Sequence, residues 1–319
     1  MSASAADWRI RSLRGPKPKV DPWKAHGALV EEERRPNGLV EHTVTVFLAG
    51  AECPFTCSFC DLWRYTIDEP TPQGALPKQI EDALLTVGVD AVARIKLYNA
   101  SNFFDRRAVP TEDLPRIAEL CAPFSGVTVE SHASTIGPAT LRFAERLSGG
   151  AGGRLEVAMG LETIHPDACT HLNKRLDLER FDRACDLLAE HDIELRVFVL
   201  LGVPGIPAQE SVEWTVRSAE YAAQLGAAIV SIIPLRGGNG EMERLANLGL
   251  FRPPTLRQLE DAFDHCVTMR ETAVTVDLWD IERLATCAAC RDERTLRLKR
   301  LNVTGRAEPP IACALCNRA

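Results

Sequence analysis

Cys53-Pro54-Phe55-Thr56-Cys57-Ser58-Phe59-Cys60 directly follows an apolar, β-branched run at residues 43–49, TVTVFLA. Its three cysteines have the spacing C-x3-C-x2-C, and thiolates are soft ligands that suit zinc or iron–sulfur clusters. A closed four-iron cluster takes four cysteines, and a structural zinc ion also takes four ligands. Because this loop offers three, a four-iron cluster held here keeps one iron open for a ligand that the protein does not supply.

A predicted strand followed by this spacing, with Phe59 just before the last cysteine, resembles the signature of the radical S-adenosylmethionine (radical SAM) superfamily. The resemblance implies that Cys53, Cys57 and Cys60 ligate a [4Fe-4S] cluster whose open iron is chelated by S-adenosyl-L-methionine. It further implies reductive cleavage to a 5′-deoxyadenosyl radical, with an electron from an external donor of the flavodoxin or ferredoxin type. The alternative is a zinc knuckle with a distant fourth ligand, or buried cysteines.

The composition is that of a globular protein, with 319 residues and 45% hydrophobic side chains. No window approaches the roughly 18–20 apolar residues of a membrane span, and the N-terminus lacks the pattern of a signal peptide. Seven of the eleven cysteines fall in tight clusters, which predicts metal binding in a reducing compartment. We therefore expect a cytoplasmic protein with no membrane partner. A net charge of −7 argues against a wholesale nucleic-acid-binding surface.

Residues 1–40 show no period, and we expect an extended arm packed by Trp8 and Trp23. From residue 41 the pattern alternates between strands and helices, which predicts an α/β fold, a partial (β/α)6 TIM-type barrel or an open sheet. The six expected strands are 43–49, 93–98, 127–130, 155–161, 195–201 and 227–233. The expected helices between and after them are 77–87, 111–120 with Thr111 as N-cap, 138–148, 177–191, 211–225 and 256–269, before a strand-like segment at 273–278.

The predicted organisation has four parts: the arm (1–40), the barrel core (41–235), a helical and strand extension (236–286) and a four-cysteine metal module (287–319). In such barrels the chemistry gathers at the carboxyl ends of the strands. The first strand ends where the three cysteines begin, so the pattern and the motif agree.

Polar residues at the ends of the second and third predicted strands are candidate cofactor contacts. Asn99 and Ser101 follow the second strand, where the superfamily binds the methionyl amino group with a glycine-rich sequence that this chain lacks. A capped loop with an Asx turn is the alternative. Glu130 and His132 end the third strand and are expected to face the same cavity, although a lone histidine is more often packed than catalytic.

The fourth and fifth predicted strands add two further candidates. Glu162, in a G-L-E-T segment that resembles the equivalent family segment, is placed to bind ribose hydroxyls or the methionyl ammonium. Its alternative role is a structural ion pair with Arg196 or Lys174. Gly202 supplies a tight turn whose backbone can approach adenine. No side chain is assigned a catalytic role.

A narrower resemblance rests on the segments KLYNASNFFD, VAMGLETIHPDACTHLNKRLDLERF, VLLGVPG and ERLANLGLFRPPT, within residues 40–255. Together they are similar to the radical-SAM branch of the Elongator catalytic subunit, and within it to the radical-SAM partner of archaeosine synthase. That resemblance implies tRNA modification on a deazaguanine. A small-molecule or natural-product substrate and a non-catalytic zinc-binding adaptor are the alternatives.

The tail contains two C-x2-C pairs 22 residues apart, which is a strong signal for a metal site. Its four cysteines are Cys287, Cys290, Cys313 and Cys316, and they suit either zinc or an auxiliary [4Fe-4S] cluster. Basic residues between the pairs either contact phosphates or form a solvated face. The isolated cysteines are treated as core or incidental residues; they are Cys121, Cys169, Cys185 and Cys266.

Overall fold

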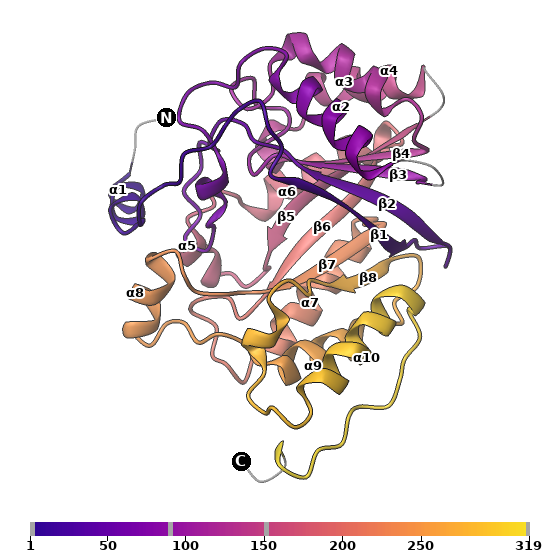
Figure 1. The fold of residues 1–319 in the computed structure, drawn as a ribbon. Helices are drawn as coiled ribbons and strands as arrows, with labels where there is room; N and C mark the ends of the chain where they lie inside the picture. Colours follow the sequence, from indigo (N-terminus) through magenta and orange to yellow (C-terminus); the bar gives the residue numbers. More distant parts are fainter. Residues whose placement is uncertain (1–3, 89–91, 150–152, 317–319) are drawn as a thin grey trace.

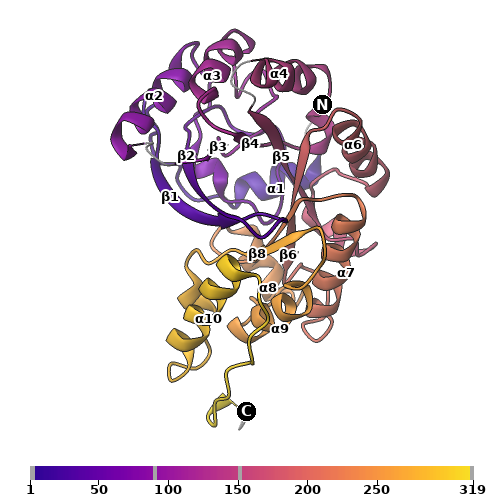
Figure 2. The same ribbon diagram turned by 90° about the vertical axis from the view of Figure 1, so that its right-hand side faces the viewer.

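The computed structural model describes residues 4–88, 92–149 and 153–316, and its centre is one eight-stranded sheet in the order β1 to β8. β1 is antiparallel to β2, and all later neighbours are parallel. Figure 2 shows the sheet curved into an incomplete barrel, with helices on its outer, convex face. The strands are β1 (Gly27–Arg34), β2 (Val40–Phe47), β3 (Arg94–Tyr98), β4 (Gly126–Glu130), β5 (Arg154–Glu162), β6 (Glu194–Leu201), β7 (Ile229–Pro234) and β8 (Ala273–Val276).

Helices alternate with the strands from β2 onward (Figure 1). The prediction of a partial α/β barrel is confirmed, because β2 to β7 correspond to the six expected strands and β8 to the strand-like segment. No helix in the described part of the chain is both long and apolar enough to cross a lipid bilayer. The α-helices are α1 (Ala5–Ser12), α2 (Ala75–Val87), α3 (Leu114–Cys121), α4 (Pro138–Ser148), α5 (Ala168–Leu172), α6 (Leu178–Glu190), α7 (Ser211–Gln224), α8 (Glu241–Asn247), α9 (Leu256–Cys266) and α10 (Arg291–Thr304).

The expectation of an extended N-terminal arm was wrong. Residues 5–12 form α1 and residues 27–34 form β1, which joins the sheet. Trp8 and Trp23 do not pack the segment, since they are 70% and 47% exposed. Thr111 is not an N-cap either: it begins a short 3-10 turn, Thr111–Asp113, ahead of α3. The four-part division of the chain stays a prediction, and residues 317–319 of its last part lie outside the described residues.

The apolar core lies between the outer face of the sheet and the helices. Alternate residues of each strand point into it, such as Val44 and Val46 in β2 and Ile95 and Leu97 in β3, all fully buried. This two-residue period is the expected side-chain alternation of a strand. The intervening residues therefore face the inside of the half-barrel, and in the first halves of the strands these are polar or charged.

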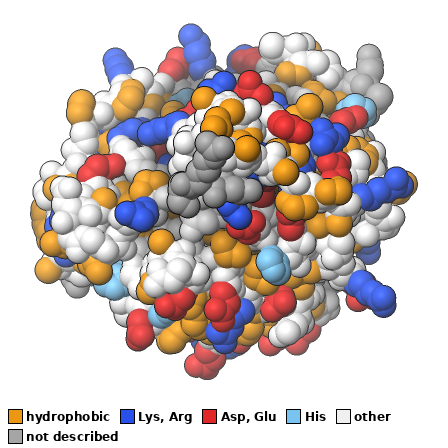
Figure 3. Space-filling model, turned by 90° about the horizontal axis from the view of Figure 1, so that it is seen from below, with side chains coloured by type: hydrophobic (Ala, Val, Ile, Leu, Met, Phe, Trp, Pro, Cys, Tyr) orange, Lys and Arg blue, Asp and Glu red, His pale blue; other side chains and the backbone are white. Residues whose placement is uncertain are grey.

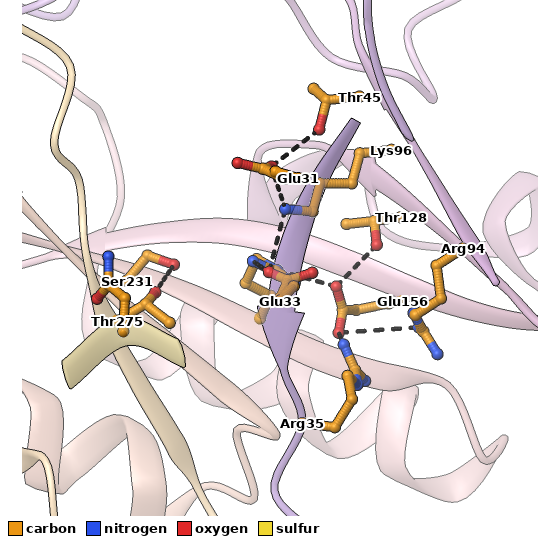
Figure 4. Close-up of polar contacts among 12 residues, drawn as sticks. Glu31, Glu33, Arg35, Thr45, Arg94, Lys96, Thr128, Glu156, Ser231 and Thr275 are labelled. Carbon is orange, nitrogen blue, oxygen red and sulfur yellow. Dashed lines mark hydrogen bonds and ion pairs between the residues drawn. The ribbon is translucent and has the colours of Figure 1, made fainter. Parts of the chain in front are cut away.

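A buried ion network fills the amino-terminal end of the half-barrel (Figure 4). Glu156 of β5, 0% exposed, accepts hydrogen bonds from Arg35 at 2.8 Å, Arg196 at 2.8 Å and Thr128 at 2.8 Å. Glu33 of β1 pairs with Arg196 at 2.6 Å. Burial alone would raise the pKa of Glu156, but the charges of its arginine partners hold that pKa well below its usual range.

The same network explains why the sequence did not predict β1. Its Glu-Glu-Glu-Arg end has no apolar periodicity, yet Glu33 is 7% exposed and also pairs with Lys96 of β3 at 3.1 Å. Charged side chains are tolerated inside a protein when they are paired and hydrogen-bonded. Because the network occupies the first halves of the strands, the open end of the half-barrel lies at the carboxyl ends of the strands.

Candidate active site and metal centre

Cys53, Cys57 and Cys60 lie on the loop that leaves the carboxyl end of β2. All three are free thiols and partly exposed. Burial raises the pKa of the Cys57 thiol to about 12, against a smaller decrease from the charge of Lys174. Burial also raises the pKa of Cys60, with further contributions from Cys57 and Cys53. The three sulfurs thus share one electrostatic environment, in which a positive metal centre would favour the thiolate forms.

The cysteine loop is fixed by hydrogen bonds to segments far away in the sequence. The Ser58 amide donates to the carbonyl of Leu172 at 2.9 Å, and the Ser58 hydroxyl donates to the carbonyl of His171 at 2.7 Å. From the other side, Asn239 Nδ2 donates to the carbonyl of Ser58 at 2.7 Å. Within the loop, the Cys60 amide donates to the carbonyl of Cys57 at 3.1 Å. The ends of α5 and of the loop before α8 therefore hold the cysteine backbone in place.

The loop after β3 contacts the cysteines through Asn102. Its Nδ2 donates to Cys53 Sγ at 3.3 Å, while its Oδ1 accepts from the His132 amide at 2.8 Å. A donor to a ligand sulfur is typical of the residues that surround a metal centre and tune it. Asn102 lies inside the quoted segment KLYNASNFFD but was not singled out from the sequence.

Asn99 and Ser101 flank Ala100, which adopts a left-handed backbone with φ of 54°. Both polar atoms of the Asn99 side chain and the Ser101 hydroxyl are buried without a hydrogen-bond partner among the described residues. The Asx turn considered as an alternative is therefore not formed by the Asn99 side chain. Unsatisfied buried polar groups are uncommon in native proteins, and they suit a loop that receives a polar ligand. Contact with the cofactor stays a prediction.

Glu130, at the end of β4, supports this loop from below. Its carboxylate accepts a hydrogen bond from the Ala100 amide at 2.8 Å. Burial raises the pKa of Glu130 to about 7, although hydrogen bonds from the backbone of residues 99–101 act in the opposite direction. The structure therefore gives this carboxylate a role in shaping the loop, whether or not it also meets the cofactor.

Glu162 ends β5 at a β-bulge, with a left-handed φ of 68°. It forms an ion pair with Lys174, one of the two partners considered from the sequence, whereas Arg196 belongs to the buried network. The charge of Lys174 lowers the pKa of Cys57, against a larger increase from burial. A β-carbon at Gly160 would collide with both members of the pair. A glycine is thus needed for this ion pair to lie across β5.

His132 and Gly202 have structural partners in this arrangement. The His132 ring stacks on Phe55 of the cysteine loop at 4.1 Å between centroids, and its Nε2 lies 3.2 Å from the Lys174 carbonyl. Burial lowers the pKa of His132 to about 4, so the ring is neutral near pH 7. The Gly202 amide donates to the Ser211 hydroxyl at 2.9 Å, and a β-carbon there would press on Pro254.

The four cysteines of the tail converge into a second centre. Their sulfurs all lie within 4.8 Å of one another, with Cys287 and Cys313 at 3.9 Å and Cys290 and Cys316 at 3.4 Å. A tetrahedral zinc ion with bonds of ~2.3 Å needs sulfurs about 3.8 Å apart. The sulfurs of a four-iron cluster each bind a different iron and must stand further apart. Among the described residues, the four tail cysteines lie close enough together to hold one metal ion. Cys53, Cys57 and Cys60 do not form such a group.

Two arginines of α10 have a structural role that was not predicted. Arg297 is 0% exposed and pairs with Asp264 at 2.7 Å and Glu260 at 3.3 Å. Arg294 pairs with Glu260 and donates from Nε to Cys290 Sγ at 3.2 Å. These side chains are therefore neither part of a solvated face nor available to phosphates. The face of the molecule around the tail mixes basic and acidic side chains (Figure 3).

No family model matches the chain. An uncharacterized protein of Methanocaldococcus jannaschii is 25% identical over 167 residues, which cover 51% of this chain and 45% of the relative. Elp3 of Methanocaldococcus infernus, solved with an N-terminal deletion, has a similar structure with a TM-score of 0.52 and 14% identity, covering 70% of this chain and 57% of Elp3. A radical SAM methyltransferase from Sphaerobacter thermophilus gives a TM-score of 0.50 and 18% identity, covering 79% and 73% of the two chains.

The chain thus spans about half the length of the first two proteins to which it is similar. At identities of 14% and 18%, the structural likenesses concern the fold alone. They show that this chain shares its α/β half-barrel fold with Elp3 and with a radical SAM methyltransferase.

Proposed function

We propose that this protein is a radical SAM enzyme in which Cys53, Cys57 and Cys60 hold a [4Fe-4S] cluster. The observation that supports it most is the position of the three free cysteines, on one loop at the open, carboxyl end of a half-barrel that a buried ion network closes at the other end. The sulfurs are not gathered around a single-ion site, which counts against the zinc-knuckle alternative and the zinc-binding adaptor.

The residues around this loop are suited to bind and orient the two cofactors. When bound, the cluster and S-adenosyl-L-methionine would supply reductive cleavage to a 5′-deoxyadenosyl radical. Asn102 donates a hydrogen bond to Cys53 Sγ, and the partly buried ammonium of Lys174 offsets negative charge on the thiolates. The unsatisfied groups of Asn99 and Ser101 offer a donor and acceptors to the methionyl end of the cofactor. Glu130 accepts a hydrogen bond from the Ala100 amide and so stabilises the left-handed backbone conformation of Ala100, between Asn99 and Ser101.

Anaerobic reconstitution tests this function. The wild-type chain should take up about four iron atoms at this loop and release 5′-deoxyadenosine when reduced with S-adenosyl-L-methionine. A variant with Cys53, Cys57 and Cys60 all changed to Ala should lose both properties. The matched control is Cys169→Ala, which removes an isolated, partly exposed thiol. Full 5′-deoxyadenosine formation by the triple variant would refute the assignment.

For the tail we propose a structural zinc ion, on the strength of the sulfur–sulfur distances of 3.4 and 3.9 Å. Structural zinc sites are closed, with four protein ligands, and they contribute folding energy directly. Metal analysis of protein expressed without added iron should give one zinc per chain. Iron in place of zinc, lost when Cys313 is changed to Ser, would favour the auxiliary cluster instead.

For the substrate, we propose tRNA modification on the basis of the segments that resemble the archaeosine-synthase partner. A second candidate, a small-molecule substrate, is favoured by the burial and pairing of Arg294 and Arg297, which removes two cations from any phosphate-binding surface. Adding tRNA or a metabolite extract to the reduced enzyme separates the two. Stimulation of 5′-deoxyadenosine release by tRNA, weakened by salt, supports the first, and stimulation by the extract alone supports the second.

A further inference from the structure

The first described residues of the chain are attached to the cysteine loop. We call residues 4–17 the N-terminal clamp; they comprise α1 and the segment that follows it. Arg14 pairs with Glu52, the residue before Cys53, at 2.7 Å, and its guanidinium lies over the ring of Trp63, 4.9 Å from the centroid. Lys17 reaches the same Glu52 at 3.1 Å. The clamp therefore holds the chain on both sides of the cysteine motif.

Asp7 of the clamp makes the central attachment. Its carboxylate is buried, with 4% of the residue exposed, and accepts a hydrogen bond from the hydroxyl of Thr56, which lies between Cys53 and Cys57. It also accepts from Asn173 Nδ2 at 3.1 Å and forms an ion pair with Arg175. Asn173 in turn donates to the Thr56 carbonyl at 2.9 Å. One carboxylate thus ties α1, the cysteine loop and the segment after α5 together.

The backbone of that segment is held in an uncommon conformation. Asn173 and Arg175 have left-handed φ values of 49° and 58°, which cost free energy for residues other than glycine. Both side chains are directed to Asp7, whereas Lys174 between them pairs with Glu162. The contacts with Asp7 therefore also help to keep Lys174 beside the cysteines.

The far end of the clamp is fitted closely to the loop before α8. Gly240 has a φ of 89°, and a β-carbon there would collide with the Leu13 carbonyl. Its neighbour Asn239 donates to the Ser58 carbonyl of the cysteine loop. Arg9 pairs with Glu241 at 3.2 Å. The clamp and the 239–241 segment thus enclose the cysteine loop from two sides.

From these contacts we infer that the N-terminal clamp holds the cysteine loop in the shape that binds the cluster, with Asp7 as its positioning residue. The inference rests on the proposed function for its effect on the cluster, while the effect on the loop itself stands independently. A loop with three ligands has one fewer protein bond to its metal than a closed site. Contacts between the N-terminal clamp and the loop backbone compensate for the missing protein bond, because residues around the ligands also hold them in place at other metal centres.

The test compares Asp7→Ala and Asp7→Asn with a control, Trp8→Ala, in the full chain. Asp7→Ala removes every contact of the carboxylate, and Asp7→Asn removes its charge but keeps an oxygen for Thr56. Trp8 is the next residue of the same helix and is 70% exposed. Two quantities are measured: hydrogen exchange of the 52–60 backbone in the purified protein, and the rate at which a chelator removes iron after anaerobic reconstitution.

Asp7→Ala should speed exchange in residues 52–60, release iron to the chelator faster than wild type and weaken the affinity for iron by about 10–100-fold, the usual range for losing an outer contact of a metal centre. In Asp7→Asn both quantities should lie between those of wild type and Asp7→Ala, and Trp8→Ala should match wild type in both. The metal at the tail cysteines should be retained in every variant, which separates a local effect from general unfolding. Equal exchange and equal iron release in Asp7→Ala and Trp8→Ala would overturn the inference.

Thr56→Val provides the same test from the other partner, in case Asp7→Ala fails to fold. Valine has the shape of threonine, whose residue is 2% exposed here, but it lacks the hydroxyl that donates a hydrogen bond to Asp7. Faster exchange at the loop supports the clamp, and unchanged exchange overturns it. If the wild-type chain takes up no iron at this loop, the proposed function fails, while the exchange measurement still decides whether the clamp holds the loop.

Discussion

Replacing Glu156 by Gln tests whether the ion network is what closes the half-barrel. Glu156 is 0% exposed and meets Arg35, Arg196 and Thr128, each at 2.8 Å. Gln retains an oxygen for Thr128 and Arg196 but turns an NH2 group toward Arg35, and the loss of the negative charge leaves Arg35 and Arg196 with Glu194 and Glu33 as their charged partners. Breaking a buried pair from one side costs about 3–5 kcal/mol, so the midpoint of thermal unfolding should fall by roughly 5–10 °C.

The measurement is thermal and urea unfolding followed by circular dichroism, with Glu81→Gln as control. Glu81 pairs with Arg116 at a similar distance, 2.7 Å, but both side chains are about half exposed, and such pairs contribute little. Glu156 also has a lowered pKa when folded, so its contribution is present above its unfolded pKa and is lost as the pH falls below about 4.5. The Gln variant should therefore lose stability less steeply in acid. Equal unfolding midpoints for both variants at pH 7 would refute the role given to the network.

Three further outcomes are expected. Glu130→Gln should flatten the dependence of stability on pH between about 4.5 and 7, because the folded protein binds a proton there that the unfolded chain does not, and urea midpoints across this range would show it. Gly160→Ala should displace the largely buried Glu162–Lys174 pair, and we expect a lower unfolding temperature and faster iron loss to a chelator after reconstitution. Arg294→Met should weaken zinc retention by the tail by about 10-fold, since the donor to Cys290 Sγ is lost, whereas Arg291→Met, an exposed control, should not.

Local sequence patterns were sufficient to predict the part of the fold that depends on them. The apolar runs predicted β2 to β7, and the spacing of the tail cysteines predicted the four-cysteine cluster. The strand β1 was missed because its glutamates suggest a solvated segment, and only the folded barrel brings Arg196 and Lys96 within reach of Glu33. The helix α10 was missed for the same reason, since its Arg297 is fully buried against Asp264 and Glu260.

The residues of the candidate site also differ in whether local sequence position is enough to predict them. The cysteines, Asn99 and Glu162 follow strands and could be found by that position alone. Asp7 and Asn239 could not, because they bond to Thr56 and Ser58 of the cysteine loop from 49 and 181 residues away in sequence. A single sequence carries no signal for such pairs. From the sequence, Asp7 is only an acidic residue in the first turn of a helix, and its hydrogen bond with Thr56 exists only in the folded chain.

The distribution of charge in the half-barrel connects stability with the proposed chemistry. Charges in the first halves of the strands are paired with one another, as Glu156 is with Arg35 and Arg196, and they fill this end, where single atoms such as Arg196 Nη2 and Glu33 Oε2 have no hydrogen-bond partner. At the carboxyl ends, Asn99 and Ser101 keep polar atoms without partners, and burial disfavours ionisation of the three thiols. Buried polar groups without partners cost free energy, and a cluster and cofactor bound there would supply partners for them. The open end is therefore the part of this molecule where bound ligands should add most to its stability.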